Sequence, residues 1–194
     1  MVTLDIDGKK YDVPTDWKDI TLEYWCGWYS IILKHQEMHK SRLKEGEFDE
    51  NKPLEKITST EMLSLNKEIF QYITKIDDET LKMCDLDSIS AAMEFIAKVT
   101  EEYKPKGLKS FIFEEEEYLF PQEAMYDNTF GDYIEATQLD MTIEHMKHGS
   151  FDVLPEQMAI LCRKIGEEYD DKKIPKKTER FRKLTMDIVW EFSF

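Results

Sequence analysis

Two similar stretches of sequence constrain the fold of this chain more than any other feature. LDIDGKKYDVPTDW lies near the start of the chain and FIFEEEEYLFPQEA near its middle. When Tyr11 is aligned with Tyr118, Pro14 falls on Pro121, and the apolar residues on either side keep the same positions. The shared pattern indicates one structural unit that occurs twice in the chain.

Both stretches have the pattern of a β-hairpin. In the first, apolar and polar residues alternate on both sides of Asp7-Gly8, a dipeptide that favours a two-residue turn. In the second, the acidic run Glu114 to Glu117 takes the place of this turn. We expect the run to form a solvated hairpin tip rather than a cation site, because runs of like charge are usually solvated. A proline ends each hairpin because it has no N–H for a strand ladder.

Helix-like segments follow each hairpin in the same order. ITLEYW after the first hairpin corresponds to TFGDYI after the second, FQYITKIDDE to ILCRKIGEEY, and SISAAMEFI to MDIVWEF. Residues 36–60 form an additional charged segment, either a loop or an extended helix end. The sequence therefore predicts a mainly α protein of the α+β class. It has two tandem units, at 1–106 and 107–194, and each is a β-hairpin followed by about three helices.

The first predicted helix runs from about Ile20 to Met38, with Thr21 or Asp19 as its cap. Its apolar residues form two neighbouring stripes at helical spacing: Leu22, Trp25, Tyr29 and Ile32, and beside them Tyr24, Trp28 and Ile31. Two stripes are wider than one core face needs. Gly27 costs about 1 kcal/mol relative to alanine inside a helix, which indicates that another group approaches closely there.

The other predicted helices have start signals and inward faces. The pairs Asp77 with Asp78 and Asp85 with Asp87 stand where helices are expected to begin, and their charge complements the helix dipole. Further start signals are a cap at Asp87 or Ser88, a cap at Asn128 or Thr129, and a first-turn proline at Pro155. The second helix places six residues inward: Met62, Leu65, Ile69, Tyr72, Ile73 and Ile76.

The charge balance restricts the partners of the protein. The chain has 26 Lys and Arg against 41 Asp and Glu, a formal net charge of −15. Such a surface repels phosphate backbones and anionic lipids, so we expect neither nucleic acid nor a membrane as partner. Three widely spaced cysteines do not suggest a disulfide framework. Without a signal-peptide pattern or an apolar run of about 18 residues, the chain is expected to be soluble and not exported by an ordinary signal peptide.

No motif in the chain indicates an enzyme. His35 and His39 lie four residues apart, but HQEMH is not the HExxH of metalloproteases, and no third ligand is evident. We expect this pair to face solvent. Gly-rich phosphate loops, GxSxG and CxxC are absent, and the aromatic neighbours of Cys26 favour a buried thiol over a nucleophile. The sequence therefore predicts no catalytic residue, no metal site and no cofactor.

One basic segment stands out in the acidic chain, because Lys172 to Lys183 contains seven cations and a single acid, Glu179. It is either a solvated helix start or a surface that meets an acidic face of a partner or of another copy of the chain. The dense aromatics of the first helix and the apolar C-terminus serve mainly the core and leave room for a docking surface. The candidate interaction residues are Trp25, Trp28, Tyr29, Lys172, Lys173, Lys176, Lys177, Arg180, Trp190, Phe192 and Phe194.

Four sequence patterns carry a resemblance to a known class of proteins. GKKYDVPxxW followed by TLEYW, then FGDYIE, then YDDKKIPKKTERF before an aromatic terminal helix, resembles small morphogenesis proteins of tailed bacteriophages. Tail assembly chaperones are the nearest functional class, and a connector or other virion component is the alternative within it. The resemblance implies a non-enzymatic protein that contacts other phage structural or assembly proteins, or copies of itself. It also implies a location in the infected bacterial cytoplasm or in the virion.

Two other classes of function are open to a chain of this composition. An acidic inhibitor could mimic nucleic acid and block a basic host protein, although the basic segment at 172–183 interrupts its acids. A metal-dependent enzyme could use His35, His39 and nearby acids. Binding that DNA competes for would favour the first of these classes, and metal lost on His39→Ala would favour the second.

Overall fold

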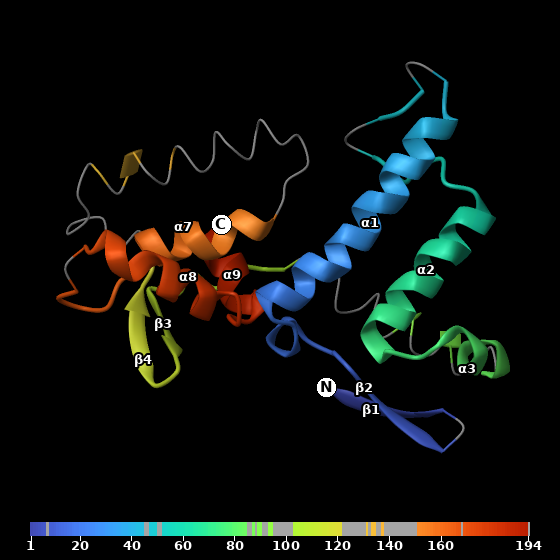
Figure 1. Cartoon of the computed structure of the whole chain (residues 1–194), viewed down its shortest axis with the longest axis horizontal. Helices are drawn as coiled ribbons and strands as arrows, with labels where there is room; N and C mark the ends of the chain where they lie inside the picture. Colours follow the sequence, from blue (N-terminus) through green and yellow to red (C-terminus); the bar gives the residue numbers. More distant parts are fainter. Residues whose placement is uncertain are drawn as a thin grey trace. The chain divides into compact units, whose positions relative to one another are not determined.

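A computed structural model of the chain is mainly helical, with two β-hairpins (Figure 1). It describes residues 1–6, 8–44, 47–49, 52–84, 87, 89–90, 93–94, 103–121, 131, 133–134, 137, 151–167 and 169–193. The predicted caps at Ser88, Asn128 and Thr129 and the candidate residue Phe194 lie outside the described residues. None of the described helices is long and apolar enough to cross a membrane.

The chain forms two compact units. The first contains Met1–Asp16 and Gly27–Glu101, and the second contains Trp17–Cys26 and Glu102–Phe194. Helix α1 (Leu22–Arg42) therefore begins in the second unit and continues in the first. The apolar residues of its first turn therefore pack in the second unit, and those from Trp28 onward pack in the first. The division predicted between residues 106 and 107 stays a prediction.

The first hairpin consists of β1 (Val2–Ile6) and β2 (Lys9–Val13), which pair antiparallel. Leu4 lies opposite Tyr11, and the last pair before the turn is Ile6 with Lys9. Gly8 has φ +75°, the left-handed conformation that a two-residue hairpin turn requires and that glycine adopts without strain. The predicted hairpin and its turn are confirmed.

The second hairpin consists of β3 (Ser110–Phe113) and β4 (Glu116–Leu119). Phe111 lies opposite Tyr118, and the last pair before the turn is Phe113 with Glu116. In the alignment that places Tyr118 on Tyr11, this register is the same as in the first hairpin. Leu119 also pairs with Arg163, because the N–H of Leu119 donates to the carbonyl of Arg163 at 2.7 Å.

The helices of the first unit begin at identifiable caps. Thr21 caps α1, since its Oγ1 accepts from the N–H of Tyr24 at 3.3 Å, as predicted. Thr58 and Glu61 form a capping box at the start of α2 (Ser59–Thr74). Asp77 caps α3 (Asp78–Met83) by accepting from the N–H of Thr80, which confirms that acids at 77–78 start a helix. Helix α1 extends to Arg42, so part of segment 36–60 is the extended helix end that the sequence left open.

Helices α1 and α2 run antiparallel, because contacts that move forward along α1 move backward along α2. Gly27 of α1 lies against Tyr72, while Lys34 contacts Glu68 and Arg42 contacts Glu61. The core of the first unit is formed by Val13, Trp28, Leu65, Ile69, Phe70, Ile73 and Ile76. Met62, predicted to point inward, is instead 37% exposed. It shares the helix face of Leu65 and Ile69 but lies in the first turn of α2, at the end of the buried row.

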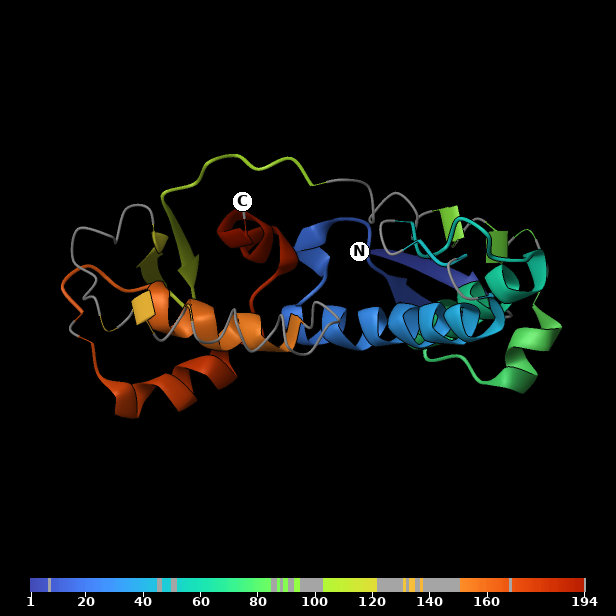
Figure 2. The ribbon, with the colours of Figure 1, turned by 90° about the horizontal axis from the view of Figure 1, so that it is seen from above.

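The described part of the second unit includes the second hairpin and the helices α7 (Leu154–Leu161), α8 (Ile174–Phe181) and α9 (Met186–Ser193). Three short 3₁₀ segments, η1 (Trp17–Asp19), η2 (Phe151–Val153) and η3 (Asp171–Lys173), lead into α1, α7 and α8. Seen from above, the orange α7 lies between α8 and α9 (Figure 2). Pro155 occupies the first turn of α7, as predicted. The core includes Ile20, Leu22, Phe111, Tyr118, Phe120, Met158, Phe181, Leu184, Met186 and Val189.

Residues just before α1 are tied to the C-terminal part of the chain. The N–H of Leu22 donates to the carbonyl of Leu184 at 2.7 Å, and that of Met186 donates to the carbonyl of Ile20 at 2.8 Å. Beside this pairing, the rings of four residues meet edge to face: Trp17, Trp25, Phe151 and Trp190. Aromatic pairs in this arrangement contribute about 0.5–1.5 kcal/mol each beyond their buried area.

Glu191 of α9 fixes the segment that leads into the second hairpin. Its carboxylate accepts from Tyr103 Oη at 2.6 Å and from the N–H groups of Lys106 and Leu108 at 2.5 and 3.1 Å. Burial on its own would raise the pKa of Glu191, but these donors outweigh it and lower the pKa. The carboxylate therefore acts as a cap for a stretch of backbone that has no ladder of its own.

The contact between α1 and α2 at Gly27 gives a first prediction. A Cβ at this position would lie 2.1 Å from Tyr72 Oη and 2.7 Å from its Cζ. We expect Gly27→Ala to destabilise the first unit by about 1–3 kcal/mol, the usual cost of overpacking, measured by urea denaturation.

Lys40→Ala, on the exposed face of the same helix, is the control and should change the stability by less than about 0.5 kcal/mol. In the double variant Gly27→Ala with Tyr72→Ala, the two effects should be far from additive because the clash disappears. Additive effects would contradict the close contact.

Candidate functional site

The turn of the second hairpin places two glutamates in an unusual backbone conformation. Glu114 and Glu115 have φ of +50° and +66°, the left-handed conformation that Asn-Gly turns normally occupy. A non-glycine residue pays about 1–2 kcal/mol for it. Both strands have strong β-formers beyond the turn, so the register forces these two residues to turn the chain.

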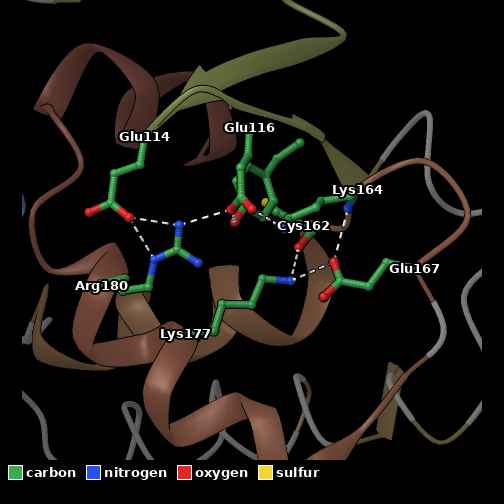
Figure 3. A network of polar contacts seen from close by, with 8 residues as sticks. Glu114, Glu116, Cys162, Lys164, Glu167, Lys177 and Arg180 are labelled. Atoms are coloured by element: carbon green, nitrogen blue, oxygen red, sulfur yellow. Dashed lines mark hydrogen bonds and ion pairs between the residues drawn. The ribbon is translucent and has the colours of Figure 1, made fainter.

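Arg180 of α8 joins the hairpin to the helix. Its Nε donates to Glu114 Oε2 at 2.7 Å and its Nη2 to Glu116 Oε2 at 2.9 Å. Figure 3 shows the guanidinium between the two carboxylates. Hydrogen bonding to Glu116, and then to Glu114, raises the pKa of Arg180 above its usual value. A planar guanidinium can bridge two carboxylates in this way, whereas a lysine ammonium is a single point charge.

Glu116 is the centre of this polar network. Besides Arg180 it receives the ammonium of Lys164 and the hydroxyl of Tyr118, whose Oη donates to Oε2 at 2.8 Å. Hydrogen bonds from Lys164, Arg180 and Tyr118, in that order of size, lower the pKa of Glu116 to about 2. Burial, aided by the bond to Glu116, raises the pKa of Tyr118 to about 12. Glu116 is therefore ionised, and Tyr118 protonated, at any ordinary pH.

Lys177 is the buried cation of the network. Its Nζ donates to the carbonyl of Cys162 at 2.6 Å and to Glu167 Oε2 at 3.3 Å. It also lies over the rings of Tyr118 and Phe181, at 5.3 and 5.6 Å from their centroids. Burial lowers the pKa of Lys177, and Glu167 opposes that shift. A buried ammonium with a carboxylate, a carbonyl and two ring faces around it is well compensated.

These contacts add to the expectation for the acidic run and divide the basic segment. The acidic run forms the predicted hairpin tip, and its residues 114, 115 and 117 are exposed. Solvation is not its whole role, because Glu114 and Glu116 are ion-paired with cations of the chain. Among the predicted interaction residues, Arg180 pairs with the second hairpin, and Lys177 pairs with Glu167 of the loop before α8. Both cations are therefore paired with carboxylates within the second unit.

The other cations of the segment lie in η3, in the first turn of α8 and just after its end, and all but the half-buried Arg182 are exposed. Lys173 and Arg182 each reach a neighbouring acid at 3.6 Å. The ammonium groups of Lys172, Lys176 and Lys183 have no hydrogen bond or ion pair with any residue that the structure describes. We call these three residues the outer lysine face.

The predicted aromatic candidates contribute mainly to the cores. Trp25 and Trp28 are buried, 6% and 1% exposed, while Tyr29, Trp190 and Phe192 are half-buried. Trp25 and Trp190 lie in the edge-to-face cluster. The buried rings of Trp25 and Trp28 therefore serve the cores of their own units. Their role in binding a partner stays a prediction.

The histidine pair lies inside the first unit, so the prediction that it faces solvent is wrong. His35 and His39 are 4% and 3% exposed. His35 Nε2 lies 3.3 Å from Glu68 Oε1, and His39 Nδ1 lies 3.5 Å from Glu61 Oε1. The i, i+4 spacing does put both rings on one helix face, but α2 covers that face with two glutamates.

Neither the histidine pair nor Cys26 has the surroundings of a reactive group. No group of three or more His, Cys, Asp or Glu among them could hold a metal ion. The two histidines face different glutamates, Glu68 and Glu61. A pocket of about 160 Å³ between α1 and α2 is lined by His35, Met38, Arg42, Thr60, Glu61 and Ser64. Cys26 is half-buried, and burial with Asp152 nearby raises its pKa to about 12, the opposite of a thiolate nucleophile.

Comparison of the chain with protein-family models, with curated proteins and with solved structures found no match in any of the three. The feature that bears most on function is the basic segment at 172–183, whose cations divide into an inner pair, Lys177 and Arg180, and the exposed outer lysine face.

The network around Glu116 predicts a specific acid sensitivity. The pKa of Glu116 is lower in the folded chain than its ordinary value of 4.5, so its contribution is present above pH 4.5 and is lost as the pH falls toward 2. We expect Glu116→Gln to be less stable than the unsubstituted chain at pH 7 and to lose less stability between pH 5 and pH 2.5. Thermal unfolding followed by circular dichroism measures this.

Glu117→Gln is the matched control, because Glu117 is exposed and accepts a hydrogen bond from Ser110 Oγ at 2.7 Å rather than from the cations around Glu116. It should follow the unsubstituted chain across the same pH range. A Glu116→Gln profile parallel to that of the control would contradict the network.

The strained turn gives a second prediction. Glycine at position 115 adopts a positive φ without steric cost but loses more entropy on folding. We expect Glu115→Gly to stabilise the second unit by about 0.5–1 kcal/mol, measured by urea denaturation. Glu115→Ala removes the same carboxylate without relieving the backbone and should bring no gain. Equal effects of the two substitutions would show that the charge of Glu115, not its φ, matters.

Proposed function

We propose that this protein is a non-enzymatic component of phage assembly that acts through protein–protein contacts. Tail assembly chaperone and head–tail or virion component are the two roles within this proposal. The phage context rests on the resemblance of GKKYDVPxxW, TLEYW, FGDYIE and YDDKKIPKKTERF to morphogenesis proteins of tailed phages.

One observation carries the protein–protein part of the proposal. In a chain with a net charge of −15, Lys172, Lys176 and Lys183 lie exposed without a partner among the described residues. The same segment satisfies its inner cations, Lys177 and Arg180, with acids of the second hairpin and the loop before α8. A segment that pairs its inner charges and leaves its outer ones unpaired has the form of an interaction surface.

We also infer that the chain arose by duplication of a hairpin-plus-helices unit. The two hairpins share one register, with Leu4 opposite Tyr11 and Phe111 opposite Tyr118. Tyr133 corresponds to Tyr24 of α1 and is helical, and the carbonyl of Tyr133 accepts from Thr137 Oγ1, a helical i to i−4 contact. Hydrogen-exchange protection of a helix over residues 129–140 would support the duplication, and rapid exchange throughout would contradict it.

The assembly role predicts the phenotype of a deletion. Removing the gene from the genome that carries it should yield incomplete particles, either heads without tails or tails without heads, counted by electron microscopy. The physical reason is that an assembly component supplies contacts that the other proteins cannot make alone. Expression of the intact gene in the host should restore complete particles, and the same gene with an early stop codon should not. Normal particles after deletion would overturn the proposed function.

A further inference from the structure

Two residues of the outer lysine face lie on one side of a continuous helical stretch. Lys172 belongs to η3, which leads directly into α8, and Lys176 follows four residues later in the first turn of α8, about 6 Å along the helix axis. Lys183 lies two residues beyond the end of α8 and is exposed. Phe181 lies on the opposite side and is fully buried. Glu179 also falls on the outer side, but it pairs with Arg182 at 3.6 Å.

We propose that the outer lysine face binds a helix of another protein that displays Asp or Glu at four-residue spacing. The inference rests on the proposed function and adds the chemistry of the partner to it. An acidic helix repeats its charges at about 6 Å, which matches the separation of Lys172 and Lys176. Opposite charges in register set the orientation of two helices as well as their attraction.

The face is held in place by the contacts on the other side of α8. Phe181 packs against the rings of Phe111, Phe113 and Tyr118 at centroid distances of 5.1–6.1 Å. Arg180 fixes the same helix to the hairpin through two carboxylates. Because α8 is already ordered, binding costs mainly the freedom of the lysine side chains rather than that of the backbone.

The charge of the whole chain selects the kind of partner. At −15, the protein repels an extended polyanion such as duplex DNA or an anionic membrane, which would meet the acidic surface as well as α8. It equally repels a second copy of itself at long range. A single acidic helix is small enough to contact the outer lysine face without approaching the rest of that surface. The attraction between its carboxylates and the lysines is not screened out at contact, because the Debye length is about 10 Å at 0.1 M salt.

The test uses the full chain and a synthetic probe. The probe is a fluorescein-labelled alanine-based helical peptide of about 20 residues with glutamate at every fourth position. Its matched control carries glutamine at the same positions. Fluorescence anisotropy is recorded at 20 mM and at 500 mM salt. We expect the glutamate peptide to bind at low salt, to bind at least tenfold more weakly at high salt, and to bind at least tenfold more tightly than the glutamine peptide.

A charge-reversal variant locates the binding. Lys172→Glu with Lys176→Glu and Lys183→Glu should weaken binding at least tenfold. The control variant reverses three exposed lysines elsewhere, Lys10→Glu with Lys44→Glu and Lys104→Glu, and has the same net charge. It should bind almost as tightly as the unsubstituted chain. Circular dichroism tests whether the two variants fold, and we expect them to give the same spectrum.

Four outcomes would overturn the proposal. In the first two, the glutamate peptide does not bind at 1 mM, or the two charge-reversal variants weaken its binding equally. In the other two, a duplex DNA of equal charge binds as tightly as the peptide, or the protein shows salt-sensitive self-association that only the outer-face variant abolishes. The last two would assign the face to nucleic acid or to a second copy. None of these outcomes decides the assembly role, because the deletion phenotype is read without reference to α8.

Discussion

A single guanidinium determines how the second unit presents its surface. Arg180 holds Glu114 and Glu116 together on one side of α8, and this contact makes a turn of two left-handed glutamates tolerable. The strained turn and the ion pairs depend on each other. The turn conformation places Glu114 beside Arg180, and the ion pairs with Arg180 stabilise that conformation. With the inner cations Lys177 and Arg180 bound in this way, the exposed cations of the segment are those of the outer lysine face and Lys173.

Much of the local structure follows from short patterns in the sequence. Asp7-Gly8, Thr21, Asp77 and Pro155 each mark an element boundary through a local mechanism, and the structure has the corresponding turn, caps and first-turn proline. The capping box was also readable, since Thr58 precedes Glu61 by three residues ahead of an apolar run. Gly27 pointed to a close contact but not to Tyr72, because helix propensity says nothing about which group comes near.

The candidate site was harder to read, because its charges depend on partners distant in sequence. Lys177 lies four residues before Phe181, on the apolar side of α8, so helical spacing alone could have placed it inside. Its acceptor, the carbonyl of Cys162, gives no signal in the side-chain pattern. His35 and His39 were misplaced for a related reason: periodicity put both on one face, but the glutamates that cover that face belong to another helix.

The pairing of residues 20–22 with residues 184–186 has a consequence for the order of events during synthesis. The second unit draws on Trp17–Cys26 and on the last part of the chain, while the sequence between them contains most of the first unit. Closing so long a loop is entropically costly and slow compared with local folding. Residues up to about Trp190 must therefore have left the ribosome before the edge-to-face cluster around Trp25 can form. Until then the first turn of α1 exposes apolar surface, so the second unit folds later than the local elements of the first.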